Sequence, residues 1–244
     1  FMAYAPIAEC FGNQDKWFGA IVVTDGAGSP RSGLYADYTD EQMKEVRIVE
    51  QKKAAMVGEY GFLAMLSHPS KEVKDAGNPK IVEELADLIR RAKPKYLYTH
   101  NLADKHETHV ATALRVIAAL RMLSPEERPE KVYGCEVWRD LDWMNDDEKV
   151  YLDCGAHPNL MRCLSAVFDS QIAGGKRYDL AAEGRRLANA TFSASHACDT
   201  YSALNYAMDL TPLLDKTIDI ADYIASYIDR FKAQVKETIG RFLE

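Results

Sequence analysis

The sequence of 244 residues predicts one α/β domain over residues 1–244, with three layers and a mostly parallel central sheet. Three observations lead to this class: short apolar runs that end in turn residues, segments with apolar residues every three or four positions, and the alternation of the two along the chain. The length suits one large domain or two small ones. We find no internal repeat, low-complexity segment or linker that would divide it.

Five stretches have the composition of strands. The first, residues 17–24 (WFGAIVVT), is continuously apolar and is followed by turn residues, which is typical of a strand buried on both faces. The remaining predicted strands are residues 62–66, 96–99, 131–137 and 149–153.

Helical spacing predicts the segments between and after these strands. A helix is expected over residues 39–59, because Thr39 followed by two acidic residues resembles a helix start. Residues 81–89 have apolar side chains at helical spacing, and this predicted helix ends before Pro94, because proline cannot continue a helix. Three more helices are expected at residues 105–122, 158–168 and 220–242. We expect the last apolar stripe to dock onto the core.

Charge and composition exclude several classes of function. The formal net charge is −7 and the basic residues are scattered, which argues against nucleic acid as a partner. No stretch has the roughly 18–20 uncharged apolar residues that a membrane helix needs, and the first residues lack the features of a signal peptide. Five dispersed cysteines without a Cys-x-x-Cys pair indicate reduced thiols and a cytoplasmic protein. A small-molecule substrate is the expected partner, and homo-oligomerisation stays open.

Polar clusters follow three of the predicted strands, where function gathers in parallel α/β sheets. They are the Asp25-Gly26 turn, residues 67–69, and a segment that contains Asp104, His106 and His109. Histidines three residues apart at a helix start project toward one side, and imidazole suits zinc, with a carboxylate to fix the ring tautomer. Two histidines are fewer than the usual three ligands. From these residues alone, a hydrated helix N-terminus is the simpler interpretation.

Three segments resemble a known family. Residues 96–120 (YLYTHNLADKHETHVATALRVIAAL) are similar to the third conserved block of the PIG-L/LmbE-like N-deacetylases, zinc enzymes that remove acetyl groups from N-acetylglucosamine units. Residues 20–28 resemble the family's second strand and Thr-Asp-Gly turn, and residues 47–58 resemble its Arg-x-x-Glu helix. The order and spacing are consistent over residues 1–120. The resemblance implies a Rossmann-like fold and hydrolysis of an N-acetylated amino sugar or its conjugate.

The resemblance also assigns roles to individual residues. His109 would be the zinc ligand of this block, His106 would stabilise the developing oxyanion, and Asp104 would orient His106. Arg47 and Asp25 would bind substrate, Arg47 at a sugar hydroxyl or an anionic substituent and Asp25 at the rim, although a plain turn role for Asp25 stays open. Zinc would polarise the acetamide carbonyl and lower the pKa of its bound water, with a carboxylate as general base.

The chain departs from the family pattern in two places. The first family block, a strand that ends in His-Pro-Asp-Asp-Glu or close to it, has no match here, and by spacing it would lie immediately before Phe1. That block would supply two ligands and the base, so we expect these 244 residues to bind zinc weakly and to lack activity. Thr108 also stands where the family often has Asp, which affects the local hydrogen-bond network more than the metal.

Other chemistry-bearing residues have simpler interpretations. Histidines 68, 100, 157 and 196 are more often capping, solvated or core residues, although His100 and His196 are the better pocket candidates. The acidic residues 140–148 lack the glycine of a calcium loop and are expected to form a solvated loop. Nearby aromatic residues form a candidate wall for a sugar ring: Tyr133, Trp138 and Trp143.

Two rival functions stay open at this point. One is a sugar-binding domain without a metal site or catalysis, which would bind sugar even with a chelator present. The other is a different hydrolase on the same fold that handles a phosphorylated sugar through Arg47.

Overall fold

The computed structural model describes residues 2–243. The chain divides into two compact units, each made of two chain segments. Unit 1 consists of Phe1–Gly77 and Leu152–Asn205, and unit 2 consists of Asn78–Tyr151 and Tyr206–Glu244. One domain over residues 1–244 therefore stays a prediction, and its two end residues lie outside the described part.

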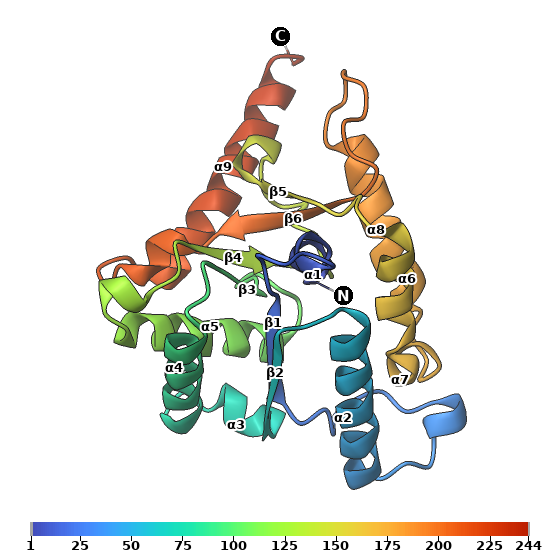
Figure 1. Cartoon of the computed structure of the whole chain (residues 1–244). Helices are drawn as coiled ribbons and strands as arrows, with labels where there is room; N and C mark the ends of the chain where they lie inside the picture. The colour runs from blue at the N-terminus through green and yellow to red at the C-terminus, as the bar shows by residue number, and fades with distance from the viewer. Residues whose placement is uncertain (1, 244) are drawn as a thin grey trace. The chain divides into compact units, whose positions relative to one another are not determined.

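Unit 1 holds a parallel pair of strands and several helices (Figure 1). Its elements are α1 (Tyr4–Cys10), β1 (Gly19–Thr24), α2 (Asp40–Val57), β2 (Phe62–His68), α3 (Ser70–Lys74), α6 (Pro158–Ala166), α7 (Asp169–Ile172) and α8 (Tyr178–Phe192). The register of the pair runs from Gly19 opposite Phe62 to Thr24 opposite His68. Of the residues in β1, only Val23 is fully buried. The expectation of a strand buried on both faces was therefore wrong, because this sheet has only two strands.

The start of α2 follows from its local sequence. The Thr39 side chain accepts a hydrogen bond from the backbone N–H of Gln42, and the Gln42 side chain accepts one from the backbone N–H of Thr39. This capping box satisfies two of the helix's unpaired N–H groups. The predicted helix start is confirmed.

The hydrophobic core of unit 1 brings α1 and α6 together. Tyr4 and Ile7 of α1 are buried with Leu160 and Leu164 of α6. The Tyr4 hydroxyl also donates to the carbonyls of Ala156 and His157, at 2.8 and 2.7 Å. Residues 4–10 thus form a helix that belongs to the core of unit 1.

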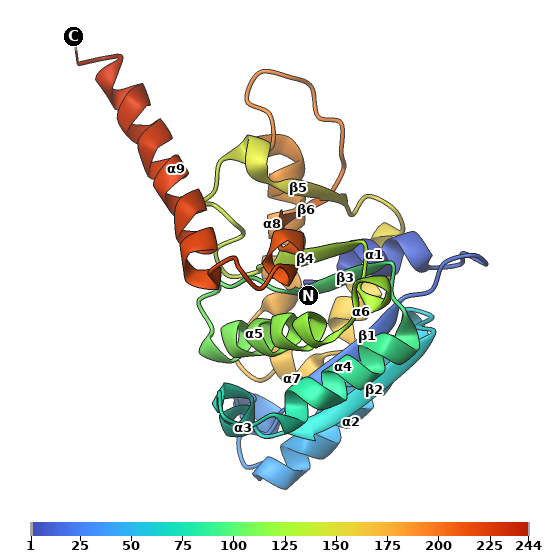
Figure 2. The same ribbon diagram turned by 90° about the vertical axis from the view of Figure 1, so that its left-hand side faces the viewer.

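Unit 2 holds a four-stranded sheet in the order β3-β4-β6-β5. Its elements are α4 (Lys80–Ala92), β3 (Tyr96–His100), α5 (Glu107–Met122), β4 (Lys131–Cys135), β5 (Val150–Asp153), β6 (Leu204–Asp209) and α9 (Ile220–Gly240), and both β5 and β6 cross into unit 1. Helix α5 packs against β3, and α4 packs against α5. Figures 1 and 2 show both helices on the same face of β3 and β4.

The α/β class is confirmed, but a mostly parallel central sheet is not seen. β3 and β4 are parallel, whereas β4 and β6 are antiparallel, with Gly134 opposite Met208. β6 was missed in the sequence, and it makes the sheet mixed. The predicted strands at residues 62–66, 96–99, 131–137 and 149–153 correspond to β2, β3, β4 and β5. The three-layer, Rossmann-like arrangement stays a prediction.

Helix α9 does not dock along its whole length, contrary to expectation. Ile224 is buried, and the Tyr223 hydroxyl donates to the Asp209 carbonyl at 2.7 Å. Farther along, Val235 and Ile239 are 41% and 53% exposed. Helical spacing predicted an apolar stripe correctly, but it does not specify what covers that stripe. None of the helices in residues 2–243 combines the length and the apolar character required to cross a membrane.

Candidate metal centre

The turn between β3 and α5 is held by its own polar groups. Asn101 is fully buried, its backbone N–H donates to the Cys135 carbonyl at 3.0 Å, and its side-chain oxygen accepts from Ala103 N–H at 2.8 Å. Asp104 Oδ1 accepts from the backbone N–H of His106 at 2.8 Å, directly before α5 begins. The positions of Asp104 and of the first turn of α5 are therefore coupled.

Asp104 and His109 form an ion pair at the centre of this turn. Asp104 Oδ2 lies 3.0 Å from His109 Nδ1, with the Asp104 side chain 1% exposed and the His109 side chain 32% exposed. Burial alone raises the pKa of Asp104, but the hydrogen bonds from the His109 ring and from His106 N–H outweigh it and hold this pKa below its usual value. An ionised carboxylate accepts only, so His109 Nδ1 donates and its Nε2 keeps a free lone pair.

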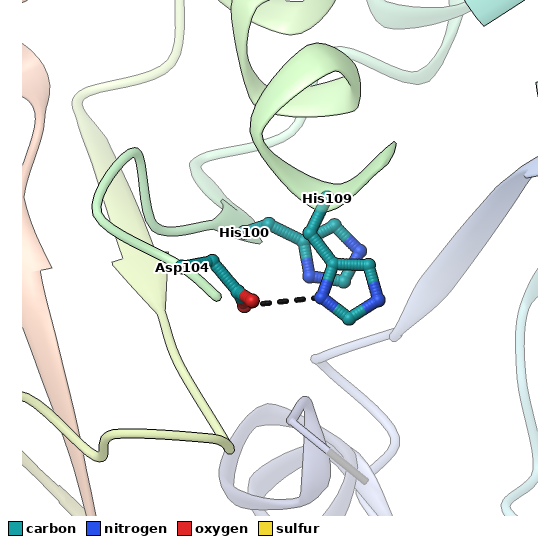
Figure 3. A group of neighbouring side chains, drawn as sticks. All are labelled: His100, Asp104 and His109. Carbon is teal, nitrogen blue, oxygen red and sulfur yellow. Dashed lines mark hydrogen bonds and ion pairs between the residues drawn. The ribbon is translucent and has the colours of Figure 1, made fainter. Parts of the chain in front are cut away.

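His100, at the end of β3, joins this pair (Figure 3). Its ring stacks on that of His109, with centroids 4.0 Å apart and planes within 5°. Burial, together with the adjacent His109, lowers the pKa of His100 to about 3, so the ring is neutral at ordinary pH. Each of His100, Asp104 and His109 offers a ligand atom, and these atoms lie within 4.8 Å of one another. We call these three residues the His–Asp cluster.

His106 lies beside the cluster on the solvent side. Its ring is exposed and stacks on the His109 ring, with the two centroids 4.9 Å apart. The centroid of the Trp138 ring lies 5.9 Å from that of His106. The Asp104 carboxylate accepts a hydrogen bond from the backbone N–H of His106, whereas its contact with a histidine ring is with His109. A column of rings therefore runs from His100 through His109 and His106 to Trp138.

The predicted aromatic wall is divided in the structure. Trp138 lies against His106, but Tyr133 packs against Tyr98 at 5.5 Å, and the Trp143 indole N–H donates to Glu136 at 3.2 Å. Sequence analysis missed Glu136, which directly follows β4 and is 3% exposed. Burial raises its pKa against the lowering effect of the Trp143 bond, and the charge of Asp104 raises it further. Its place at the carboxyl end of a strand was the signal that could have identified it.

The acidic residues 140–148 were wrongly expected to form a fully solvated loop. Asp140, Leu141 and Met144 are each at most 2% exposed. The residues between and after them are partly or fully exposed. Leu141 and Met144 are apolar and are therefore buried, although the many acidic residues around them favoured a solvated loop.

Arg47 and Asp25 belong to unit 1 and have their own partners there. An Arg47 Nη1 atom donates to the Glu50 carboxylate and lies 3.5 Å from Ser170 Oγ, and the guanidinium lies over the Phe168 ring at 5.3 Å. Asp25 Oδ1 accepts from Ala27 N–H at 3.1 Å. The guanidinium charge is thus matched by a buried carboxylate, and substrate binding by either residue stays a prediction.

The turn at Asp25 also explains why a glycine follows. Gly26 has φ +79°, and a Cβ at this position would lie 2.6 Å from Arg47 Cγ. Only glycine combines this backbone conformation with such a close approach. The Thr-Asp-Gly turn therefore packs directly on the Arg47 side chain.

The other histidines are outside the cluster. His68 is buried and lies 3.2 Å from Glu72, as expected for a core histidine, while His196 is exposed. His157 precedes α6 and lines an open hollow of unit 1 with Phe11 and Cys163. Of the two favoured pocket candidates, only His100 joins the metal-binding geometry.

The fold and the cluster together define a mixed α/β protein with a candidate metal site at the end of a strand. Residues 2–120 match the model of the PIG-L family, described as GlcNAc-PI de-N-acetylase. The match confirms the resemblance found in the sequence and includes Arg47, Asp104 and His109. No curated protein sequence matches the chain.

Solved structures resemble this chain in fold at low identity. GalB, the 4-carboxy-2-hydroxymuconate hydratase from Pseudomonas putida KT2440, is 15% identical with a TM-score of 0.67, over 86% of this chain and 90% of that chain. The N,N'-diacetylchitobiose deacetylase from Pyrococcus horikoshii is 11% identical with a TM-score of 0.63, over 90% and 82%. The A40926 pseudoaglycone deacetylase Dbv21 is 16% identical with a TM-score of 0.57, over 85% and 90%. These structures include a hydratase, so the fold alone does not define the reaction.

Proposed function

We propose that this protein is a zinc-dependent N-deacetylase that hydrolyses the acetamide of an N-acetylglucosamine-type sugar or its conjugate. The observation that carries the proposal is the His–Asp cluster, which lies inside the segment that matches a de-N-acetylase family. The fold it shares with two deacetylases is consistent with that activity.

The donor set of the cluster fits zinc. Two imidazoles and a carboxylate are ligands that catalytic zinc sites use, with a further position open to water or substrate. His100 is neutral and Asp104 is ionised, which are the forms that bind a metal. Sequence comparison assigned only His109 as a ligand, but His100 and Asp104 lie beside it. We therefore propose that His100 and His109 hold the metal while Asp104 fixes the His109 ring, and we expect stronger binding than His109 alone would give.

The surrounding residues have distinct tasks in this proposal. Bound zinc would polarise the acetamide carbonyl and lower the pKa of water toward neutrality. Asp104 keeps the His109 ring in one tautomer and orientation. His106, exposed beside His109, is placed to donate a hydrogen bond to the carbonyl oxygen as negative charge develops there.

The phosphorylated-sugar alternative has less support. It requires the Arg47 guanidinium to be available to an anion, but Glu50 already neutralises this charge. Both partners of this ion pair are largely buried, because the Arg47 side chain is 17% exposed and the Glu50 side chain is 5% exposed. An incoming phosphate would have to replace a buried ion pair, which carries a large desolvation cost.

The test measures zinc content and acetate release on the same protein. The sequence predicts that these 244 residues bind zinc weakly and are inactive. If the His–Asp cluster is sufficient, the protein should instead hold close to one zinc per chain after dialysis, and it should release acetate from N-acetylglucosamine or a conjugate in a reaction that a chelator abolishes and added zinc restores. His109→Ala removes both, whereas His196→Ala, an exposed histidine outside the cluster, keeps both. Sugar binding that persists with the chelator, without acetate release, would support the binding-domain alternative. A chain that takes up no zinc even when zinc is added in excess would contradict the assignment of the His–Asp cluster as a metal site.

A further inference from the structure

Residues 136–143, which follow β4, pack against the turn between β3 and α5 in the same unit. We call residues 136–143 the β4 loop. Arg139 Nη1 donates to the Ala103 carbonyl at 2.6 Å, and the Trp138 ring lies 5.9 Å from the His106 ring between centroids. The β4 loop therefore contacts the turn that carries the His–Asp cluster through both its backbone and a histidine ring.

The backbone of the β4 loop has an unfavourable conformation. Asp140 and Leu141 have φ of +54° and +59°, in the left-handed region that residues with a side chain seldom adopt. Both residues are buried, at 1% and 0% exposed. Residues in this region persist where the surrounding contacts fix their conformation, and they gather at functional sites. The β4 loop is therefore held in one path, and this path carries Trp138.

Glu136, at the start of the β4 loop, is its buried anchor. Glu136 Oε2 accepts the Trp143 indole N–H at 3.2 Å and lies 3.5 Å from the backbone nitrogen of Leu141. Its Oε1 is also buried and has no hydrogen-bond partner among the described residues. A buried oxygen without a partner lowers stability. The position of this carboxyl is therefore better explained by the path that it gives the loop than by a gain in stability.

His106 needs support from outside its own segment. Its ring is exposed, and its side chain forms no hydrogen bond with the described residues. Its ring contacts are with His109, at 4.9 Å between centroids, and with Trp138. Both lie in the range of about 4.5–7 Å at which aromatic rings attract one another. A group that stabilises a developing oxyanion must already have the right orientation, and these rings can supply it.

We propose that Trp138 is a positioning residue, which holds the His106 imidazole in the orientation from which it donates to the developing oxyanion. This inference rests on the proposed deacetylase function, in which His106 has that task. The β4 loop holds Trp138 in turn, and Lys105 Nζ, over the Trp138 ring at 5.8 Å, adds a cation–π contact to the same ring. Trp138 thus acts through another side chain, unlike the sugar wall expected from the sequence.

Steady-state kinetics give the first test. Trp138→Ala should lower kcat for acetate release about threefold to tenfold, because a His106 ring without this contact occupies other staggered rotamers. KM and zinc content should stay unchanged, because Trp138 contacts neither substrate nor metal in this proposal. Trp138→Phe keeps an aromatic ring and should recover most of the rate. Trp17→Ala, at a 72% exposed position in unit 1, is the matched control and should keep the full rate.

A double variant shows whether the effect passes through His106. In a chain that already has His106→Ala, Trp138→Ala should cause no further loss of kcat, because the ring that it positions is absent. An equal fold-loss with and without His106 would overturn the proposal, because the two residues would then act independently. A raised KM with unchanged kcat in Trp138→Ala would also overturn it, because Trp138 would then contact the substrate directly.

Nuclear magnetic resonance of ¹³C-labelled histidine tests the same contact without enzyme activity. The His106 ring resonance is identified by its absence in His106→Ala. At one fixed pH, Trp138→Ala should move this resonance, because the ring current of Trp138 is lost. The resonances of His68 and His196, which belong to unit 1, should stay in place. A His106 resonance that does not move would overturn the proposal.

Two substitutions of Glu136 test the anchor in the same spectrum. Glu136→Ala removes the acceptor of the Trp143 N–H and should move the His106 resonance, whereas Glu136→Gln still accepts this bond and should leave it in place. A resonance that stays in place in Glu136→Ala would exclude Glu136 as the anchor. If the unmodified protein holds zinc but releases no acetate, the deacetylase function fails, and the spectrum still decides whether Trp138 holds His106.

Discussion

Asp104 Oδ2 lies 3.0 Å from His109 Nδ1, while Asp104 Oδ1 accepts the N–H of His106 that begins α5. One carboxylate thus fixes both the ring of a candidate metal ligand and the backbone from which the next histidine projects. Because Asp104 is buried, the ring orientation of His109 is set before any metal binds.

This relationship makes Asp104→Asn an informative substitution. The amide keeps the shape of the side chain but loses its charge, so it no longer ensures that His109 Nδ1 is the protonated nitrogen. We expect zinc affinity to fall about 10–100-fold, as for other partners of ligating histidines, in a competition titration against a chromophoric chelator. Asp87→Asn, at an exposed position on α4, is the matched control and should not alter affinity. Equal affinity in Asp104→Asn and in the unmodified protein would contradict this role.

His106 and His109 should separate turnover from metal binding. His106 is exposed next to the cluster and His109 is part of it. We expect His106→Ala to lower kcat by about 10²–10³, the usual loss for one donor to a developing oxyanion, with zinc content unchanged. Parallel assays of acetate release and zinc content check this prediction. Loss of zinc in His106→Ala would show that His106 is itself a ligand.

Glu136 gives a prediction about stability and pH. Burial raises its pKa, so the folded protein retains a proton that the unfolded chain loses. As pH rises from the unfolded pKa to the raised folded pKa, the unfolded state is increasingly favoured. Glu136→Gln removes this effect and can still accept the Trp143 hydrogen bond. We expect the variant to be more stable than the unmodified protein at pH 7.5, and little different at pH 4, in urea unfolding at both values. A stability difference that is independent of pH would contradict the assignment.

Arg47 gives a prediction that separates structure from substrate binding. Its ion pair with Glu50 is largely buried, and Glu50 also accepts hydrogen bonds from Ser170 N–H and its hydroxyl. Arg47→Met leaves an uncompensated carboxylate, so we expect a loss of about 3 kcal/mol in the free energy of unfolding. Arg91→Met, which breaks an exposed pair on α4, should cost less than about 1 kcal/mol. A variant that unfolds like the unmodified protein but has a raised KM would instead support direct substrate binding by Arg47.

Features that depend on neighbouring residues were predictable from the sequence. The start of α2 at Thr39 needs only the capping groups within one helical turn, and the end of α4 before Pro94 needs only the missing N–H of proline. The Asp-x-His-x-x-His pattern at Asp104, His106 and His109 likewise lies within a short segment. These local signals allowed the family, and one candidate ligand, to be identified before the fold.

Features that depend on distant residues were decided by tertiary structure. β6 lies about 70 residues after β4 in the chain, and its antiparallel pairing with β4 made a sheet that was expected to be mostly parallel into a mixed one. Arg47 finds Ser170 at a separation of 123 residues. His100 becomes part of the His–Asp cluster because the turn after β3 folds back on the start of α5. Apolar spacing in α9 predicted a stripe but not its exposure. Sequence determines local hydrogen bonding and which faces are apolar, whereas the contacts between distant segments decide what those faces and charges meet.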